Sequence, residues 1–366
     1  MKFSYKNIFY LILFLALLSR VYIVFFSGLP WYGPDTGNYI KMARAIIDGN
    51  PISFFPNGFP LLLAGTILVS SDHFTLVLVI LNILMQTGAI ILIEKIMVKY
   101  NVEWKTRLLI IFIISFYPHL MNNVRLVLTE SVSLFLIALS LLFYDSGKYS
   151  MSGFFGYLTC TFRPSLVLVF PLLIIYDLLR KKKTPALNTS AGFLTGLILF
   201  LCLEWTGLVA APNNYEYNAV LAVNSYGNNI NFKLTGVDNY EIHHPVKTYF
   251  NFMVNHPGQY IKQRFLSLWN LWGPLTYTGF SIKSFMLHVV RFPLFILALL
   301  AFLYRKIMNY KPDLILLISL PVISITMIHF FFISTSRHQI VAEPFAIILT
   351  MLFLRFLLIR KSQNLL

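Results

Sequence analysis

A small set of ionisable side chains lies at or near the ends of apolar segments, where proton transfer and phosphate binding are both possible. The set comprises two acids, three arginines and a histidine: Asp35, Glu130, Arg125, Arg163, Arg337 and His338. A carboxylate can take a proton from a nucleophile, and a guanidinium group binds phosphate oxygens in a bidentate way. Ionisable groups at membrane depth are costly unless they are paired or face a wet cavity. These residue types therefore predict acid–base work on an anionic, phosphate-bearing ligand.

The two acids also have structural interpretations. Asp35 precedes a segment whose apolar residues keep a helical period, as an N-cap residue does. Both roles are compatible, because a carboxylate at a helix start is already oriented. Glu130 begins an apolar helical pattern, and its alternative role is a purely structural ion pair with Arg125 or Arg163.

The basic residues have structural alternatives of the same kind. Arg163 stands before Pro164 and would suit a helix end anchored at the lipid headgroups. The pair Arg337-His338 would suit side chains that reach out to the membrane interface. What favours one common site is that the predicted topology places all of these residues on the same side of the membrane.

The elements that carry these residues are membrane helices. Of the 366 residues, 57% are hydrophobic and 12% are charged, whereas a soluble domain carries about 25% charged residues. Apolar runs of about 20 residues recur along the chain. We therefore predict a single transmembrane domain, 1–366, of an all-α polytopic membrane protein. The first apolar segment has no small-residue cleavage site behind it and is predicted to be a retained helix.

Ten membrane spans are predicted, and Lys and Arg set their orientation. The spans are roughly 8–26, 75–97, 107–121, 126–144, 151–162, 165–179, 188–210, 285–304, 313–333 and 340–359. Alternate connections hold clusters of Lys and Arg, which the positive-inside rule places in the cytoplasm together with both termini. The net charge of +15 thus reflects membrane topology, and we expect no nucleic-acid partner. The expected location is the plasma membrane.

Two connections on the predicted outer side are long. The first outer loop, 27–75, contains the apolar stretch Phe59–Ser70, which is short for a crossing and is interpreted as an interfacial helix. A short true crossing is the alternative. The large outer loop, 211–285, contains Asn255–Pro274, which suits an amphipathic helix on the membrane or an element of an aromatic belt.

Several common chemistries lack their residues. His243, His244 and His256 do not have the spacing of a metal site with carboxylate or cysteine help, so we expect no metal ion. There is no Gly-rich phosphate-binding loop and no Gly-x-Ser-x-Gly elbow, which argues against nucleotide-sugar or ATP chemistry. Cys160 and Cys202 lie inside apolar segments, so no disulfide framework is expected.

The order of several short motifs resembles the GT-C membrane glycosyltransferases, and among them the bacterial relatives of protein O-mannosyltransferases and aminoarabinose transferase. The motifs are a first apolar helix ending in Arg20, PDTGNYIKMARAIIDGNP at Pro34, FPNGFPLLLAG at Phe55, LTESVSLFL at Leu128, TFRPSLVLVFPLL at Thr161, NHPGQYIKQRFLSLW at Asn255 and SRHQIVAEPF at Ser336. They extend from residue 20 to about 345 and so cover most of the chain. The resemblance implies a GT-C-like fold with a juxtamembrane helical loop on the outer face after the first helix.

The resemblance also implies an activity: transfer of one sugar from a polyprenyl-phosphate carrier to a glycan, lipid or protein acceptor outside the membrane. It gives Asp35 the role of catalytic base and makes Glu130 the second acid. Arg163 and Arg337 would neutralise the leaving phosphate, with His338 and Arg125 as further donor-binding candidates. Tyr39, Asn57 and Trp269 are expected along the substrate groove. No cofactor is implied.

The sequence departs from the family pattern in two places. Many members have two adjacent acids after the first helix where this chain has Asp35 alone, so metal dependence is not expected. His338 stands where relatives often have tyrosine.

Two other functions fit many-span proteins. An O-antigen polymerase or ligase also has a large outer loop with arginines and histidines, but does not require an acid directly after the first helix. A flippase or transporter of lipid-linked sugars predicts charges near mid-membrane, broken helices and often internal repeats. Here the charges gather at one predicted face and no repeat is visible.

Overall fold

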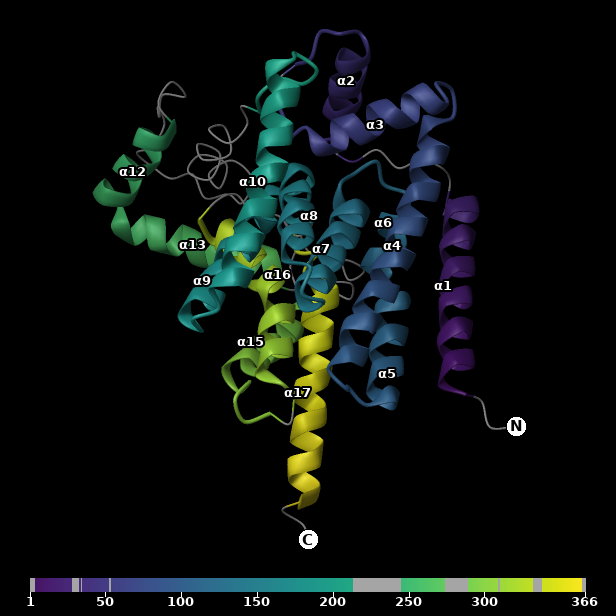
Figure 1. The fold of residues 1–366 in the computed structure, drawn as a ribbon, viewed down its shortest axis with the longest axis vertical. Coiled ribbons are helices and arrows are strands. Elements are labelled where there is room, and N and C mark those ends of the chain that lie inside the picture. The colour runs from purple at the N-terminus through teal and green to yellow at the C-terminus, as the bar shows by residue number, and fades with distance from the viewer. Residues whose placement is uncertain are drawn as a thin grey trace.

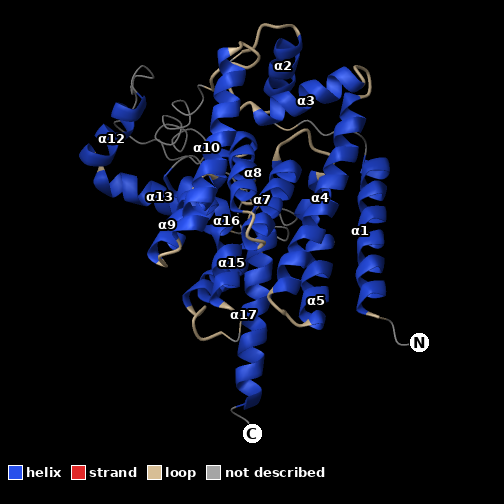
Figure 2. Cartoon of the chain, viewed as in Figure 1, coloured by secondary structure: helices blue, strands red, loops and turns tan. Residues whose placement is uncertain are grey.

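The structure, a computed structural model, describes residues 4–27, 33, 35–52, 54–212, 245–273, 289–308, 310–331 and 338–363. All regular structure within these ranges is helical, without a strand (Figure 2). Four helices are long and apolar enough to cross a membrane: α1 (Tyr5–Ser27), α4 (Phe74–Lys99), α10 (Lys183–Trp205) and α16 (Pro312–Phe331). The expectation of an all-α membrane protein is confirmed at this level.

The remaining helices are shorter, apart from α17. They are α2 (Thr36–Ile47), α3 (Gly58–Val69), α5 (Trp104–Ser115), α6 (Pro118–Asn123), α7 (Glu130–Asp145), α8 (Tyr149–Phe162), the 3-10 helix η1 (Pro164–Leu166), α9 (Val169–Leu179), α12 (Pro245–Asn255), α13 (Pro257–Trp272), α15 (Arg291–Leu303) and α17 (Glu343–Gln363). Each predicted span overlaps one of these helices or one of the four long ones. The number of crossings stays a prediction.

The predicted boundaries are wrong at one corner. The span expected at 107–121 is two helices, because Pro118 starts α6 anew after the chain leaves α5 at Ser115. The next helix, α7, begins at Glu130 and not at 126. A side chain of α4 holds the backbone between α6 and α7. The amide of the fully buried Asn82 donates to the carbonyl oxygens of Val124 and Leu126, at 3.1 and 3.0 Å. A turn stabilised in this way has no apolar period that the sequence could reveal.

The helices pack side by side, with the start of α1 and the end of α17 toward one end of the bundle and α2 and α3 at the other (Figure 1). Whereas α4 runs along the bundle, α3 lies across its end (Figure 1). The closest helix packing joins α8 to α10, where a Cβ added at Gly192 would lie 1.9 Å from the Ser150 carbonyl oxygen. Only glycine permits such a close approach of two backbones.

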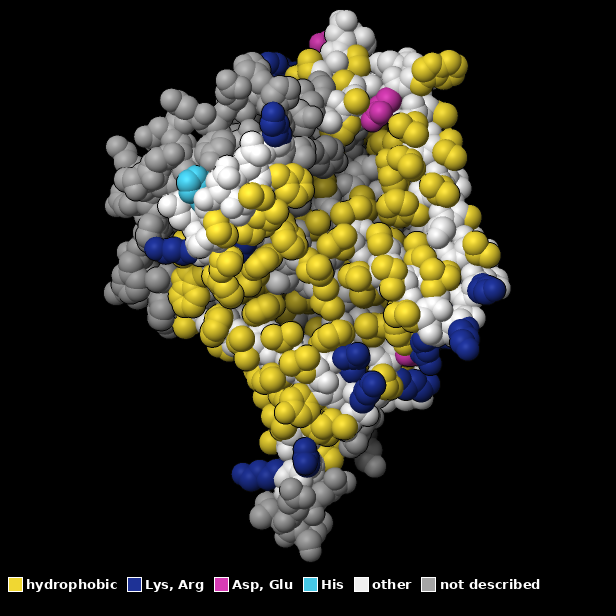
Figure 3. Space-filling model, turned by 90° about the vertical axis from the view of Figure 1, so that its left-hand side faces the viewer, with side chains coloured by type: hydrophobic (Ala, Val, Ile, Leu, Met, Phe, Trp, Pro, Cys, Tyr) yellow, Lys and Arg dark blue, Asp and Glu magenta, His cyan; other side chains and the backbone are white. Residues whose placement is uncertain are grey.

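The surface agrees with a lipid environment. Seen from the left-hand side of Figure 1, apolar side chains cover most of the middle of the molecule, and Lys and Arg lie around the margins (Figure 3). Large apolar side chains are strongly exposed, among them Phe25 at 76%, Leu68 at 72% and Trp205 at 89%. Soluble monomers rarely expose apolar patches larger than a few hundred Å². This surface is therefore suited to contact with lipid.

Candidate functional site

The structure brings Glu130 and Arg163 together. Glu130 is the first residue of α7, and its Oε1 lies 3.2 Å from Nη1 of Arg163, which follows α8. Their side chains are 2% and 8% exposed. Arg163 also donates from Nη2 to the carbonyl oxygen of His338 at 2.8 Å. Of the two structural partners considered for Glu130, Arg163 forms this ion pair. The pair places one acid and one guanidinium group where α7, the end of α8 and the segment before α17 meet.

A chain of buried polar groups holds the start of α7 in place. Arg20 of α1 donates from Nε to Gln86 Oε1 of α4 at 3.2 Å, and Gln86 donates to the Ser131 hydroxyl at 3.1 Å. Arg20 also binds the Ser115 carbonyl oxygen at the end of α5. Buried polar networks whose members find partners rigidify their surroundings. Ser131 follows Glu130 directly, so three helices fix the position of that carboxylate.

The segment between α1 and α4 contacts both segments that carry the ion pair. On α2, the Thr36 hydroxyl, which is fully buried, donates to the Val127 carbonyl oxygen at 3.2 Å, three residues before Glu130. On α3, a Cβ at Gly58 would lie 2.5 Å from the hydroxyl oxygen of Thr161, two residues before Arg163. The loop between α1 and α4 therefore folds over this corner of the bundle.

Asp35 stands at the N-terminus of α2, immediately before Thr36. It occupies the N-cap position but makes no capping hydrogen bond from its side chain. The Gly33 amide, before the helix, donates to the Thr36 hydroxyl at 2.9 Å and ties this segment to the first turn. A carboxylate at a helix N-terminus is stabilised by the helix dipole. Asp35 is thus held by backbone contacts next to the corner that carries Glu130.

The other predicted donor-binding residues do not share one environment in the structure. Arg125 is half-buried, and Asn82 holds the backbone on either side of it. The His338 ring stacks on His329 with 4.2 Å between ring centroids. Arg337 lies outside the described residues.

The three predicted groove residues lie on different elements: Tyr39 on α2, Asn57 just before α3 and Trp269 on α13. Tyr39 is 8% exposed and packs against Phe55 and Phe59, with ring centroids 4.6 and 4.9 Å away. Asn57, also buried, donates to the Ala210 carbonyl oxygen at 2.8 Å. Trp269 on α13 is 42% exposed. Tyr39 and Asn57 thus stabilise the segment between α1 and α4 through these contacts.

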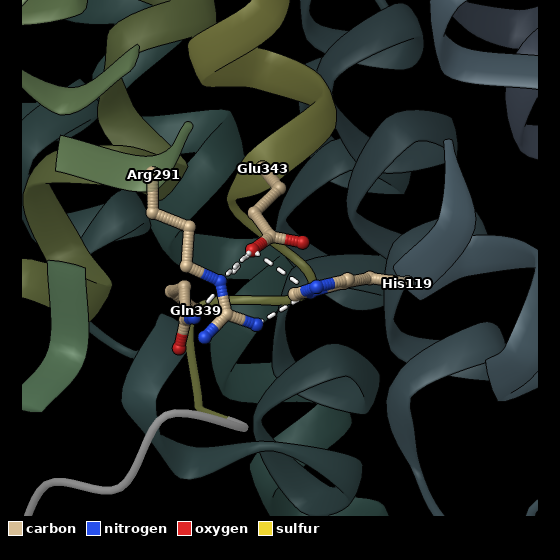
Figure 4. A network of polar contacts seen from close by, with 4 residues as sticks. All are labelled: His119, Arg291, Gln339 and Glu343. Atoms are coloured by element: carbon tan, nitrogen blue, oxygen red, sulfur yellow. Dashed lines mark hydrogen bonds and ion pairs between the residues drawn. The ribbon is translucent and has the colours of Figure 1, made fainter. Parts of the chain in front are cut away.

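A second buried ion pair was not anticipated from the sequence (Figure 4). Arg291, the first residue of α15, donates from Nε to Oε1 of Glu343, the first residue of α17, at 2.9 Å. His119 Nδ1 lies 3.4 Å from the same oxygen and also contacts Arg291. The Gln339 amide nitrogen also lies 3.4 Å from Oε1 of Glu343. The side chains of Arg291 and Glu343 are 2% and 0% exposed.

The two ion pairs are neighbours along the chain. His338 offers its carbonyl oxygen to Arg163, and the next residue, Gln339, belongs to the Glu343 network. The short segment 338–343 is therefore anchored at both ends by a buried arginine. The available signal was the presence of Arg291 and Glu343 inside predicted spans, where ionisable residues are rare and often functional.

The arrangement can bind an anion and handle a proton. Among the residues that the structure describes, no group of three or more His, Cys, Asp or Glu side chains could hold a metal ion. No protein-family model matches the chain, and no curated protein matches it either.

Proposed function

We propose that the protein is an integral-membrane glycosyltransferase of the GT-C type, which moves one sugar from a polyprenyl-phosphate donor to an acceptor hydroxyl on the extracytoplasmic side. The observation that carries this proposal is the contact between Thr36 and Val127. It brings the helix start that bears Asp35 to the corner that bears the Glu130–Arg163 pair. A base, a second acid and a phosphate-binding cation are the groups that direct glycosyl transfer requires.

The reaction is a displacement at the anomeric carbon of the donor. The acceptor hydroxyl oxygen forms a bond to that carbon and gives its proton to Asp35, while the bond from the carbon to the phosphate oxygen breaks. Polyprenyl phosphate leaves with the bonding electrons. Arg163 stabilises its negative charge, assisted by Arg337 and His338, with Arg125 in a lesser role.

Glu130 keeps Arg163 in position and binds a hydroxyl of the acceptor or the donor. A guanidinium that already has an ion pair and a carbonyl contact needs little reorganisation when charge develops, and such preorganisation lowers the barrier. The ten-span topology, with both termini in the cytoplasm and the site outside the plasma membrane, belongs to this proposal.

The test is transfer by the purified protein in proteoliposomes, with synthetic polyprenyl-phosphate sugars and release of polyprenyl phosphate as the readout. Asp35→Asn is expected to lower the rate about a hundredfold or more, the usual effect of removing a general base. Asp48→Asn is the matched control, because Asp48 is an exposed acid at the other end of the same helix. Equal rates for wild type and Asp35→Asn would refute the assigned base. Movement of the donor across the bilayer without phosphate release would instead identify a transporter.

A further inference from the structure

Helix α13 has the reverse polarity of a helix in a soluble protein. Between residues 261 and 270 every buried position carries a polar side chain: Gln263, Arg264, Ser267 and Asn270. The exposed positions are apolar apart from Lys262, with Ile261 at 54%, Phe265 at 64% and Trp269 at 42%. Side chains four residues apart lie on one face of a helix, so these three form a single line, the α13 stripe.

This arrangement suits hydrocarbon and not water. A helix on a soluble protein turns its apolar stripe toward the core and its polar face toward solvent. In a membrane the order is reversed, because polar side chains there face the interior of the bundle. The exposed apolar side chains continue onto α12, where Phe250 is 54% and Val254 is 70% exposed. Both helices lie at the left-hand margin of the bundle in Figure 1, and apolar side chains cover most of the middle of that side (Figure 3).

The first half of α13 is fastened to the end of α16, which has the length and composition of a membrane span. Arg264 is 1% exposed and donates from Nη1 to the carbonyl oxygens of Phe330, at 3.0 Å, and of Phe331. The Tyr249 hydroxyl of α12 also donates to the Phe331 carbonyl oxygen, at 2.8 Å. Carbonyl groups in the last turn of a helix lack intrahelical donors, and a guanidinium there meets the negative end of the helix dipole. These contacts place this part of α13 level with the end of the span.

The second half of α13 lies deeper along the same span. Trp272 is 1% exposed and donates from its indole nitrogen to the Thr326 hydroxyl at 3.1 Å. Thr326 precedes Phe330 by four residues, which is about 6 Å along α16. No charged residue follows Arg264 within α13. The helix therefore descends from the end of the span toward its middle, and the part that descends is uncharged.

We propose that α13 enters one leaflet of the membrane obliquely and that the α13 stripe contacts lipid acyl chains, with Trp269 about 6 Å deeper than Ile261. The leaflet is the one at the Phe331 end of α16. The sequence pattern is equally compatible with a helix that lies flat on the membrane, and the inclination follows from the contacts of Arg264 and Trp272 with α16. This inference does not depend on the proposed glycosyl transfer.

The test is electron paramagnetic resonance on the purified chain in proteoliposomes, with nitroxide labels on single cysteines. The cysteines are introduced by Ile261→Cys, Phe265→Cys or Trp269→Cys into a background in which Cys160 and Cys202 are replaced by alanine. All three labelled positions are exposed, so the labels need not disturb the packing of α13.

We expect the labels at positions 265 and 269 to collide more often with oxygen, which concentrates in hydrocarbon, than with a water-soluble nickel chelate. The depth calculated from the two collision rates should increase by about 6 Å from position 261 to position 269. The matched control is Asp72→Cys at an exposed acid before α4, whose label should collide mainly with the nickel chelate.

Three outcomes would overturn the proposal. More frequent collisions with the nickel chelate than with oxygen at position 265 would show that the α13 stripe faces water. Infrequent collisions with both reagents would show that protein covers the stripe, and broadening of the spectrum by a neighbouring nitroxide would identify a second copy of the chain. Equal depths at positions 261 and 269 would refute the oblique entry.

Discussion

The Arg291–Glu343 pair offers a quantitative test of the structure, because both side chains are almost completely buried. Glu343→Gln keeps the size of the side chain but removes the charge that Arg291 Nε contacts at 2.9 Å. Breaking a buried pair by removing one partner costs about 3–5 kcal/mol, because the remaining charge is left uncompensated. His119 contacts the same carboxylate oxygen and loses its anionic partner too. We expect a loss of stability in this range for Glu343→Gln alone.

A double-mutant cycle separates the pair from its surroundings. The variant with both Arg291→Gln and Glu343→Gln no longer holds an unpaired charge, so its loss should be smaller than the sum of the two single losses by about 2 kcal/mol or more. The matched control is the pair Arg180–Asp313, whose side chains are both 44% exposed. Exposed pairs couple by about 1 kcal/mol or less.

The assay is reversible unfolding in mixed micelles by titration with a denaturing detergent, followed by tryptophan fluorescence. Both cycles are measured under the same conditions, so that systematic errors cancel. Equal coupling energies for the buried and the exposed pair would contradict the reasoning. So would a double variant as unstable as the sum of the single ones, because it would mean that Arg291 and Glu343 act independently.

Two further substitutions test how the site is supported. Asn82→Ala removes the amide that binds the Val124 and Leu126 carbonyl oxygens. It should lower the free energy of unfolding by about 1–3 kcal/mol in the same assay. A stability equal to wild type would show that this turn does not depend on Asn82. Gly192→Ala places a methyl group 1.9 Å from the Ser150 carbonyl oxygen and should cost about 3 kcal/mol or more through forced separation of α8 and α10. Its control is Gly65→Ala, where nothing lies within 4 Å of the new Cβ. This variant should be more stable than the wild type by about 0.5–1 kcal/mol. Similar changes in stability at both glycines would refute the close packing of α8 and α10.

Hydropathy predicts the long helices well and their ends less well. The span expected at 75–97 is α4, Phe74–Lys99, because an unbroken apolar run leaves a helix no alternative in lipid. Hydropathy predicts that this helix starts at 126, whereas α7 begins at Glu130. The reason is that Asn82, more than 40 residues earlier, binds the backbone before it. Long-range contacts to backbone atoms leave no periodic pattern.

The candidate site was partly predictable for a similar reason. An acid such as Glu130 in an apolar segment needs a partner, and Arg163 was among those considered. The contribution of His338 comes from its carbonyl oxygen, which every residue possesses, so no side-chain pattern could indicate it. The pairing of Arg291 with Glu343 depends on the register between α15 and α17, which a single sequence does not contain.

The shortness of the two helices that carry the Glu130–Arg163 pair has a consequence for a lipid-linked donor. With 16 and 14 residues, α7 and α8 are about 24 and 21 Å long, whereas the hydrocarbon core of a bilayer is about 30 Å thick. In the proposed membrane placement both helices therefore fall about 6–9 Å short of the hydrocarbon thickness. No residue of α7 is exposed, so other helices and not lipid surround it. The proposed glycosyl transfer thus predicts that the Glu130–Arg163 pair lies below the level of the headgroups, and that a polyprenyl-phosphate donor must bring its phosphate down to the guanidinium between the helices.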